Sequence, residues 1–461
     1  MKKRVLQAFL FVSLLSLINS SCKKELKPEA DSLKGNKESS AGPSGHLQQT
    51  KTFSSDVVVK WLDMQLNLLR VPLAPGATST AADRAQGYSG VTAYEAVVPG
   101  MPSYQSLYGQ LIDFPAMPST EPGKAYHWAA SANAALAEIN RKLFPGASAA
   151  NKTAINNLEK TLETQYASEV EPYTLARSIE FGKEVATRVF AWASTEITPN
   201  TCSYVDPTAA ELLANPSLWI RTSPAAPAVN PCSRYTRFFV PDVSEGTALA
   251  GPPPFSTAPG TAFHNMVLDV YNKKKNATPD QLASAEYYRD APGYPGGGSF
   301  VAIYSQLLVK AQPTLDVAAL GYAKTGMAQH EATLVCFNNK YNYLLIRPVT
   351  YIKQYIDATW NTHIPTPNHP EYPSGHSTIG GAVTAMYADI FGENFQITLH
   401  TYDYLVPALP PRSYNSFTEM VTEMANSRVF GGIHYQATCD ESMIQGKKVA
   451  MNILAKIKFQ K

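Results

Sequence analysis

The order of apolar and polar residues along the chain predicts a mostly helical protein. In the segment 56–70, DVVVKWLDMQLNLLR, apolar residues recur at three- and four-residue spacings, which is the period of an amphipathic helix. The same spacing recurs in 124–144 and from 149 to 193. Few segments alternate as half-buried strands do. We therefore expect an all-α body.

A Pro-rich segment interrupts this helical pattern. Residues 198–260 contain TSPAAPAVNPC and AGPPPFSTAPG, which is typical of an extended connection. Helices resume later, where Thr278 is the expected N-cap and Pro279 the first helical residue. We therefore predict an N-terminal helical part at 53–197, the Pro-rich connection, and a C-terminal helical part at 261–461.

The first 22 residues have the pattern of a secretion signal. Three basic residues precede an apolar run, and small residues then lead to Cys22. This resembles the lipid-modified cysteine of bacterial lipoproteins, which implies export and a lipid anchor in the cell envelope, at the outer membrane or in the periplasm. Cleavage without lipid attachment is the alternative. The polar stretch 23–52 predicts a flexible tether.

Charge and hydropathy exclude two classes of partner. Charged residues make up 16% of the chain and the net charge is +2, so no basic field is present that would bind a nucleic-acid backbone. No uninterrupted apolar run of about twenty residues follows the signal. We therefore expect no nucleic-acid partner, and membrane contact only through the anchor.

Cysteine usage permits disulfides in an exported chain. If Cys22 carries the lipid, an even number of thiols remains: Cys202, Cys232, Cys336 and Cys439. Cys202 with Cys232 would close the Pro-rich loop, and Cys336 with Cys439 would join two segments of the candidate site. Four free thiols are the alternative, and the sequence leaves both open.

Two basic residues near the C-terminus form the first candidate motif. Lys340 and Arg347 are seven positions apart, which on one helix is almost two turns. Both would then lie on one face, about 10 Å apart along the axis, and could converge on one small anion. An ordinary solvated helix face is the alternative.

The stretch PSGH at 373–376 is the second motif. A helix expected to begin at Pro373 and Ser374 would present free backbone N–H groups and its positive dipole end to an anion. Gly375 would let a ligand approach closely, Ser374 would add a hydroxyl donor, and His376 would stand beside the anion. The alternative is an ordinary helix cap.

The third motif is SRVFGGIH, in which Arg428 precedes His434 by six positions. An unbroken helix would point these side chains in different directions. Gly431 and Gly432 allow the helix to end and the chain to turn, so the two side chains could converge.

Taken together and in this order, Lys-x6-Arg-Pro, Pro-Ser-Gly-His and Ser-Arg-x5-His resemble the tripartite signature of type 2 phosphatidic acid phosphatases, bacterial acid phosphatases and vanadium-dependent haloperoxidases. Weaker likeness upstream, in 56–70, is to exported haloperoxidase-like bacterial proteins. The resemblance implies an all-α helical bundle that holds phosphate or vanadate. The implied oxyanion-binding residues are Lys340, Arg347, Ser374, Gly375 and Arg428.

The resemblance also implies two catalytic histidines. His434 would approach the central atom axially, attacking phosphorus in a phosphatase or bonding vanadium in a haloperoxidase. His376 would act as acid and base on the opposite side. His369 matches a position that lines the halide pocket of algal bromoperoxidases, and a plain loop histidine is the alternative.

One position departs from the family pattern. Thr438 stands where an aspartate commonly orients the second histidine. We therefore expect His434 to be less basic than in the family. No orienting partner for His376 can be identified.

Length and the absence of membrane spans favour the haloperoxidase branch. The expected reaction is oxidation of a halide by hydrogen peroxide with bound vanadate as cofactor. The alternatives are a soluble phosphatase that hydrolyses phosphate monoesters through a phosphohistidine, without a cofactor, and an envelope lipoprotein that binds oxyanions without catalysis.

Overall fold

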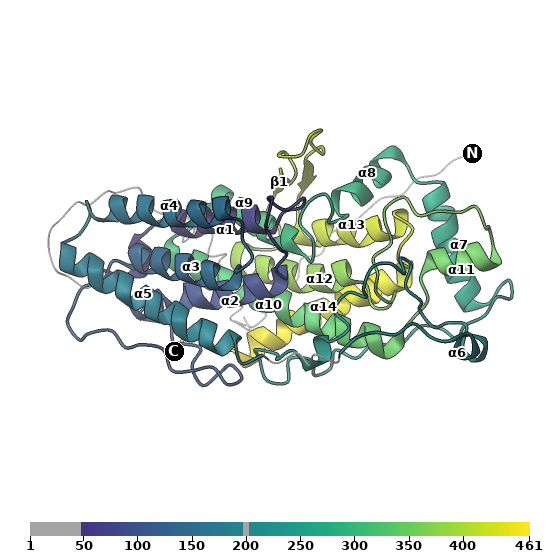
Figure 1. The fold of residues 1–461 in the computed structure, drawn as a ribbon, viewed down its shortest axis with the longest axis horizontal. Helices are drawn as coiled ribbons and strands as arrows, with labels where there is room; N and C mark the ends of the chain where they lie inside the picture. Colours follow the sequence, from purple (N-terminus) through teal and green to yellow (C-terminus); the bar gives the residue numbers. More distant parts are fainter. Residues whose placement is uncertain (1–47, 197–201) are drawn as a thin grey trace, which may run out of the picture.

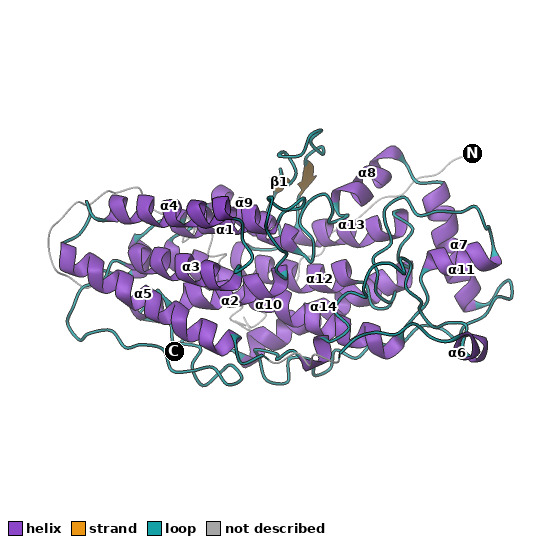
Figure 2. Cartoon of the chain, in the orientation of Figure 1, coloured by secondary structure: helices purple, strands orange, loops and turns teal. Residues whose placement is uncertain are grey.

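Helices account for most of the regular structure in the computed structural model, which describes residues 48–196 and 202–461 (Figure 1). One antiparallel strand pair, β1 (Ile397–Leu399) with β2 (Arg412–Tyr414), stands out from the helical body (Figure 2). The expected all-α class is thereby confirmed. The first helices are α1 (Asp56–Leu69), α2 (Ala82–Glu95), α3 (Trp128–Leu143), α4 (Ala149–Tyr166), α5 (Pro172–Ala193), α6 (Ala209–Ala214) and α7 (Ala262–Lys275).

The remaining helices carry the candidate motifs. They are α8 (Pro279–Tyr287), α9 (Gly298–Ala311), α10 (Leu315–Tyr343), α11 (Pro348–Tyr355), α12 (Gly375–Phe391), α13 (Phe417–Phe430) and α14 (Gln436–Lys456). Short 3-10 turns are η2 (Thr50–Thr52), η3 (Val98–Gly100) and η4 (Ser233–Tyr235).

The long helix α10 connects two groups of helices. It packs along α2, which belongs with α3 and α5, and it also packs against α12, which in turn contacts α13 and α14. Figure 1 shows the first group at the left and the second group in the middle and right of an elongated molecule. One apolar core runs through both groups, from Val57 to Phe459.

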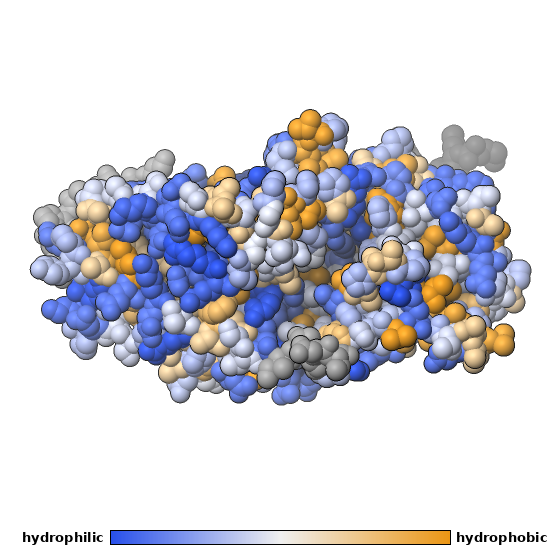
Figure 3. All heavy atoms as spheres, viewed as in Figure 1, coloured by the Kyte–Doolittle hydropathy of each residue, from blue (hydrophilic) through white to orange (hydrophobic). Residues whose placement is uncertain are grey.

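The apolar pattern correctly predicted several of these helices. The helix α1 begins at Asp56, and Thr278 caps α8 with Pro279 in its first turn. The stretch 149–193 forms two helices, because Pro172 lacks the N–H that an uninterrupted helix needs and starts α5 instead. On the face shown in Figure 3, hydrophilic residues cover much of the N-terminal helices, as amphipathic packing requires.

The Pro-rich connection contains the disulfide. Cys202 and Cys232 are bonded, with their Cα atoms 5.8 Å apart. Cys336 and Cys439 are buried free thiols, so the alternative that pairs them is wrong. Cys336 lies beside the turn at 373–374, where its Sγ is 3.8 Å from the Pro373 carbonyl oxygen, and Cys439 lies near the Ser377 and Ser374 hydroxyls.

The predicted secretion signal, Cys22 and most of the predicted tether lie outside the described residues. Within 48–196 and 202–461, no helix has both the length and the apolar character needed to cross a bilayer.

The helices α12 and α14 cross with their backbones almost in contact. A Cβ atom on Gly446 would lie 1.9 Å from the Thr378 carbonyl oxygen, and one on Gly381 would lie 2.4 Å from the Met443 carbonyl oxygen. Glycine is therefore required at both positions. Since α12 begins with the PSGH motif and α14 follows His434, this crossing fixes the spacing of two site segments.

Replacing Gly446 by Ala is expected to destabilise the fold by about 3 kcal/mol, at the upper end for overpacking, because neither backbone can move aside alone. Chemical denaturation would measure the loss of unfolding free energy. Ile444→Ala on the exposed side of α14 is the matched control, and it should change stability little. Equal stability of Gly446→Ala and the wild type would contradict the close crossing.

Candidate active site

Lys340 and Arg347 do not share a helix, so the expected common helix face is wrong. The helix α10 ends at Tyr343, and Leu344 takes a left-handed conformation with φ 48°. Arg347 is extended and caps α11, because a residue before proline is restricted from the helical region. The two cations are brought together by this break and not by helical periodicity.

Lys340 is fully buried at the end of α10. Its Nζ donates to the carbonyl oxygens of Pro370 at 2.9 Å and Glu371 at 3.2 Å, and also to that of Pro373. Burial is the main reason that the pKa of Lys340 falls to about 7. These contacts tie the helix end to the loop that precedes the PSGH motif.

Arg347 is also fully buried, and it touches two histidines. Its NH1 donates to the Ile433 carbonyl oxygen at 2.8 Å and lies 3.2 Å from His434 Nε2. Its NH2 lies 2.9 Å from His369 Nδ1, and its Nε donates to the His369 carbonyl oxygen at 2.9 Å. The guanidinium therefore links the segment before α12 to the segment before α14.

The PSGH motif begins α12 as expected, with Ser374 as the N-cap. Ser374 Oγ accepts from Ser377 Oγ at 3.0 Å, which leaves its own proton free to donate. A Cβ atom on Gly375 would meet nothing within 4 Å. The first turn of α12 therefore offers open space beside its unpaired backbone N–H groups.

Asp290 is the partner of His376 that sequence reasoning could not name. Its Oδ1 lies 3.0 Å from His376 Nε2, across 86 positions of sequence. Asp290 follows α8 in a left-handed conformation with φ 72°. An ionised carboxylate only accepts hydrogen bonds, so the proton is held on Nε2 and the lone pair is left on Nδ1.

Arg428 approaches from α13, where it is almost fully buried. Its NH1 donates to the Tyr288 carbonyl oxygen, whereas its buried Nε has no partner among the described residues. The helix ends at Phe430, and Gly432 has φ 80°, as the paired glycines predicted. The chain then turns and places His434 in front of α14.

Glu371 contacts His434, and sequence reasoning missed this pair. The Glu371 side chain is fully buried, with Oε1 lying 2.8 Å from His434 Nδ1 and accepting from the Tyr435 N–H at 3.0 Å. Thr438 Oγ1 donates to Oε2 at 3.0 Å. The expectation that His434 lacks an orienting carboxylate is therefore wrong. The available signal was an acidic residue inside the otherwise uncharged stretch PEYPSG.

The electrostatics show that these groups share one neighbourhood. Burial lowers the pKa of His434 well below its usual range, and Arg347, Lys340, His369 and Arg428 lower it further. Burial, Arg428 and Lys340 likewise lower the pKa of His376, while Asp290 opposes the shift. Both imidazoles are therefore neutral at pH 7, as bases and ligands must be.

The buried charges do not balance. Arg347 and Arg428 are positive, and Lys340 adds a third positive charge when it is protonated. The nearby carboxylates are Glu371, which contacts His434, and Asp290, which lies near Arg428. Burial raises the pKa of Glu371 to about 7, opposed by the Tyr435 N–H and the two nearer cations. Buried charge is costly unless it is paired, so this arrangement favours a bound anion.

His369 lies in the wall of this cluster. It is buried, its ring meets Phe337 edge-on with centroids 5.2 Å apart, and its Nδ1 accepts from Arg347. Its assignment to a halide pocket stays a prediction.

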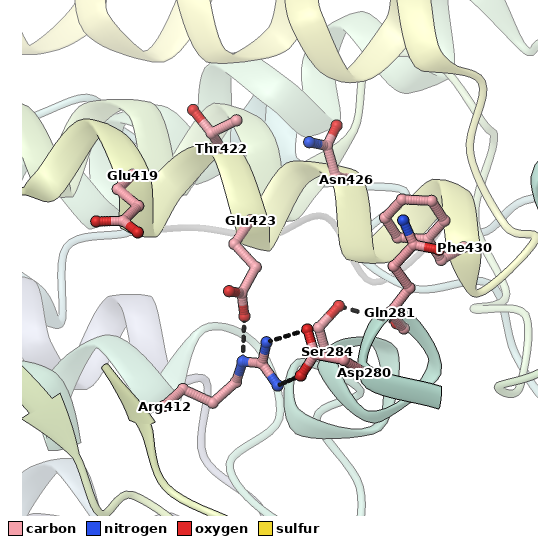
Figure 4. Close-up of a pocket in the computed structure, with 9 residues that line it drawn as sticks. All are labelled: Asp280, Gln281, Ser284, Arg412, Glu419, Thr422, Glu423, Asn426 and Phe430. Carbon is pink, nitrogen blue, oxygen red and sulfur yellow. Dashed lines mark hydrogen bonds and ion pairs between the residues drawn. The ribbon is translucent and has the colours of Figure 1, made fainter. Parts of the chain in front are cut away.

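A surface pocket of about 320 Å³ lies on the other side of α13 (Figure 4). Arg412 in this pocket bonds Asp280 at 3.1 Å and is paired with Glu423. Its charge is therefore neutralised within the protein, unlike that of Arg428 on the buried face of the same helix. The pocket is not the anion site.

Comparisons with known proteins agree with this arrangement. The family model of the VCPO second helical-bundle domain matches residues 321–460. No curated protein matches the chain by sequence. The resemblance to the haloperoxidase and phosphatase superfamily, stated from the three motifs, is confirmed for this part of the chain.

Solved structures share the fold over most of its length. A bacterial vanadium-dependent iodoperoxidase matches with a TM-score of 0.77 and 25% identity, covering 88% of this chain and 98% of that one. A holo-type bacterial vanadium-dependent chloroperoxidase matches with a TM-score of 0.62 and 17% identity, covering 83% and 94%. The apo-type enzyme matches with a TM-score of 0.60 and 17% identity, covering 83% and 97%.

Replacing Arg428 by Ala is expected to weaken binding of inorganic phosphate by about 10- to 100-fold, because charge-assisted hydrogen bonds are lost from a buried site. Arg428→Lys should lose less, since it keeps the charge. Isothermal titration calorimetry would measure both affinities.

Arg412→Ala is the matched control, because its guanidinium is already paired with carboxylates on the opposite side of α13. Its phosphate affinity should equal that of the wild type. An equal loss in the Arg412 and Arg428 variants would contradict the assignment of the anion site.

Proposed function

We propose, from the premise that residues 321–460 form a second helical bundle of the vanadium chloroperoxidase type, that this protein is a vanadium-dependent haloperoxidase. It would use bound vanadate to oxidise a halide with hydrogen peroxide. The observation that carries the proposal is the contact of His434 with both Arg347 and Glu371 in a cluster with excess buried positive charge.

The residues fit vanadate. The Arg428 Nε is a buried donor without a partner among the described residues, and space lies open over Gly375. Arg428, Ser374 and the Gly375 amide would donate hydrogen bonds to the oxyanion. Lys340 and Arg347, whose N–H groups are bonded within the protein, would contribute positive charge. The Nε2 atom of His434 would bond the metal, because it is the unprotonated ring nitrogen. The donors are cations and hydrogen-bond donors, which suits an anion.

Bound vanadate would supply a Lewis acid that activates hydrogen peroxide toward attack by a halide. The cations of the site would hold its negative charge. His434 keeps its proton on Nδ1 because Glu371 accepts it there. His376 would accept a proton from peroxide at Nδ1, while Asp290 stabilises the imidazolium that forms.

Iodide is the first halide to test. The iodoperoxidase shares more sequence and a higher TM-score with this chain than either chloroperoxidase structure does. His369, which lies in the wall of the site beside Arg347, is proposed to line the halide pocket.

Hydrolysis of phosphate monoesters is the second candidate. The unprotonated Nε2 of His434 is equally suited to act as a nucleophile toward phosphorus, and vanadate mimics phosphate. Binding without catalysis is less well supported. It was suggested by Thr438, which stands where the family commonly has an orienting aspartate. In this structure, Glu371 contacts His434 instead.

Export with a lipid at Cys22 remains part of the proposal. The Cys202–Cys232 disulfide supports an oxidising compartment, since disulfides persist outside the reducing cytosol.

Replacing His434 by Ala should reduce vanadate-dependent oxidation of iodide and bromide to background, because the bond to vanadium is lost. A colorimetric assay with peroxide and a phenol dye would measure halogenation. Parallel assays with aryl phosphates and no vanadate would test the second candidate.

His400→Ala is the control, because this half-exposed histidine pairs with Asp403 outside the site. It should keep wild-type activity. Full activity of the His434 variant, or halogenation that persists after exhaustive removal of vanadium, would refute the proposal.

A further inference from the structure

Glu371 joins the three segments that carry the anion-binding residues. Its backbone N–H donates to the Leu345 carbonyl oxygen at 3.0 Å, beside Arg347, and its own carbonyl oxygen accepts from Lys340 Nζ at 3.2 Å. Its carboxylate meets the start of α14, where it contacts His434 and Thr438. The residue therefore lies where the ends of α10 and α13 and the start of α14 converge.

Two independent contacts fix the tautomer of His434. A guanidinium has no acceptor, so Nε2, which lies 3.2 Å from Arg347 NH1, must be unprotonated. The proton is consequently on Nδ1, and this atom lies 2.8 Å from Glu371 Oε1. The carboxylate and the guanidinium hold the two sides of one ring.

We infer that Glu371 is a positioning residue for His434, whose carboxylate holds the Nδ1 proton and directs the Nε2 lone pair at a bound oxyanion. The role is the one that the family resemblance gives to an aspartate at position 438. This inference rests on the proposed function for its ligand, vanadate.

The residue at 438 is consistent with a transferred carboxylate. Thr438 donates its hydroxyl proton to Glu371 Oε2 at 3.0 Å, where a second carboxylate would repel the first. In this chain the carboxylate stands in the loop before α12 and not on α14. In that loop, Glu371 lies near the buried cations Arg347 and Lys340. Burial raises the pKa of Glu371, and both cations oppose this shift.

The inference can be tested by removing the carboxylate at position 371 and introducing one at position 438. Glu371→Gln keeps the size of the side chain and removes its charge, so vanadate should bind about 10- to 100-fold more weakly, as for other partners of metal-binding histidines. Adding Thr438→Asp to that variant returns a carboxylate to the ring and should restore most of the affinity. Thr438→Asp alone should bring no gain. Vanadium NMR titration measures binding without turnover.

Glu331→Gln is the matched control. Glu331 is a fully buried glutamate on α10 whose Oε1 accepts from the Phe239 and Val240 N–H groups, and burial raises its pKa to about 8. Replacing this carboxyl group by an amide should leave vanadate affinity unchanged. If Glu371→Gln does not fold, Glu371→Asp withdraws the carboxylate by one methylene and should also weaken binding.

Wild-type affinity in the Glu371 variants would overturn the inference. So would a loss that Thr438→Asp fails to restore, since packing of the loop would then be the role of Glu371. Vanadate binding without halide oxidation in the wild type would end the proposed function but leave the comparison of these variants intact. Titration with inorganic phosphate provides the same comparison if the wild type does not bind vanadate.

Discussion

Burial of positive charge is the constraint on which the rest of this site depends. Lys340, Arg347 and Arg428 are almost inaccessible to water, and ions in that position are stable only with compensating partners. Backbone carbonyl oxygens from the loop before α12 satisfy Lys340, and the same loop supplies Glu371. The irregular, Pro-rich conformation of this loop leaves three of its carbonyl oxygens unpaired by secondary structure, and these oxygens accept from the buried Lys340 ammonium.

The helical body serves this arrangement by holding chain ends in place. The helix α10 packs along α2 for much of its length, and Lys340 lies in its last turn. The glycine crossing of α12 and α14 sets the distance between the PSGH turn and His434. The main core is continuous between the two groups of helices, and a second buried cluster that includes Ile346, Tyr372 and Tyr435 packs around the site.

The sequence allowed prediction of features that depend on neighbours in the chain. Helix starts at Thr278 and Ser374, and the turn after Arg428, follow from capping and glycine preferences. It did not allow prediction of contacts between distant segments. Asp290 contacts His376 across 86 positions, and Glu371 contacts His434 across 63 positions. No local sequence pattern indicates such a pair. The helix break after Tyr343 was missed because Leu344 carries no glycine signal for its left-handed conformation.

The two free thiols, Cys336 and Cys439, lie beside the PSGH turn, where their reactivity matters. Thiolate, rather than thiol, reacts with oxidants, and burial raises the pKa of both Cys336 and Cys439. An enzyme that releases oxidised halogen would expose its own sulfur to chemical attack. In the haloperoxidase proposed above, keeping both sulfur atoms protonated and away from solvent would slow their oxidation by the halogen product.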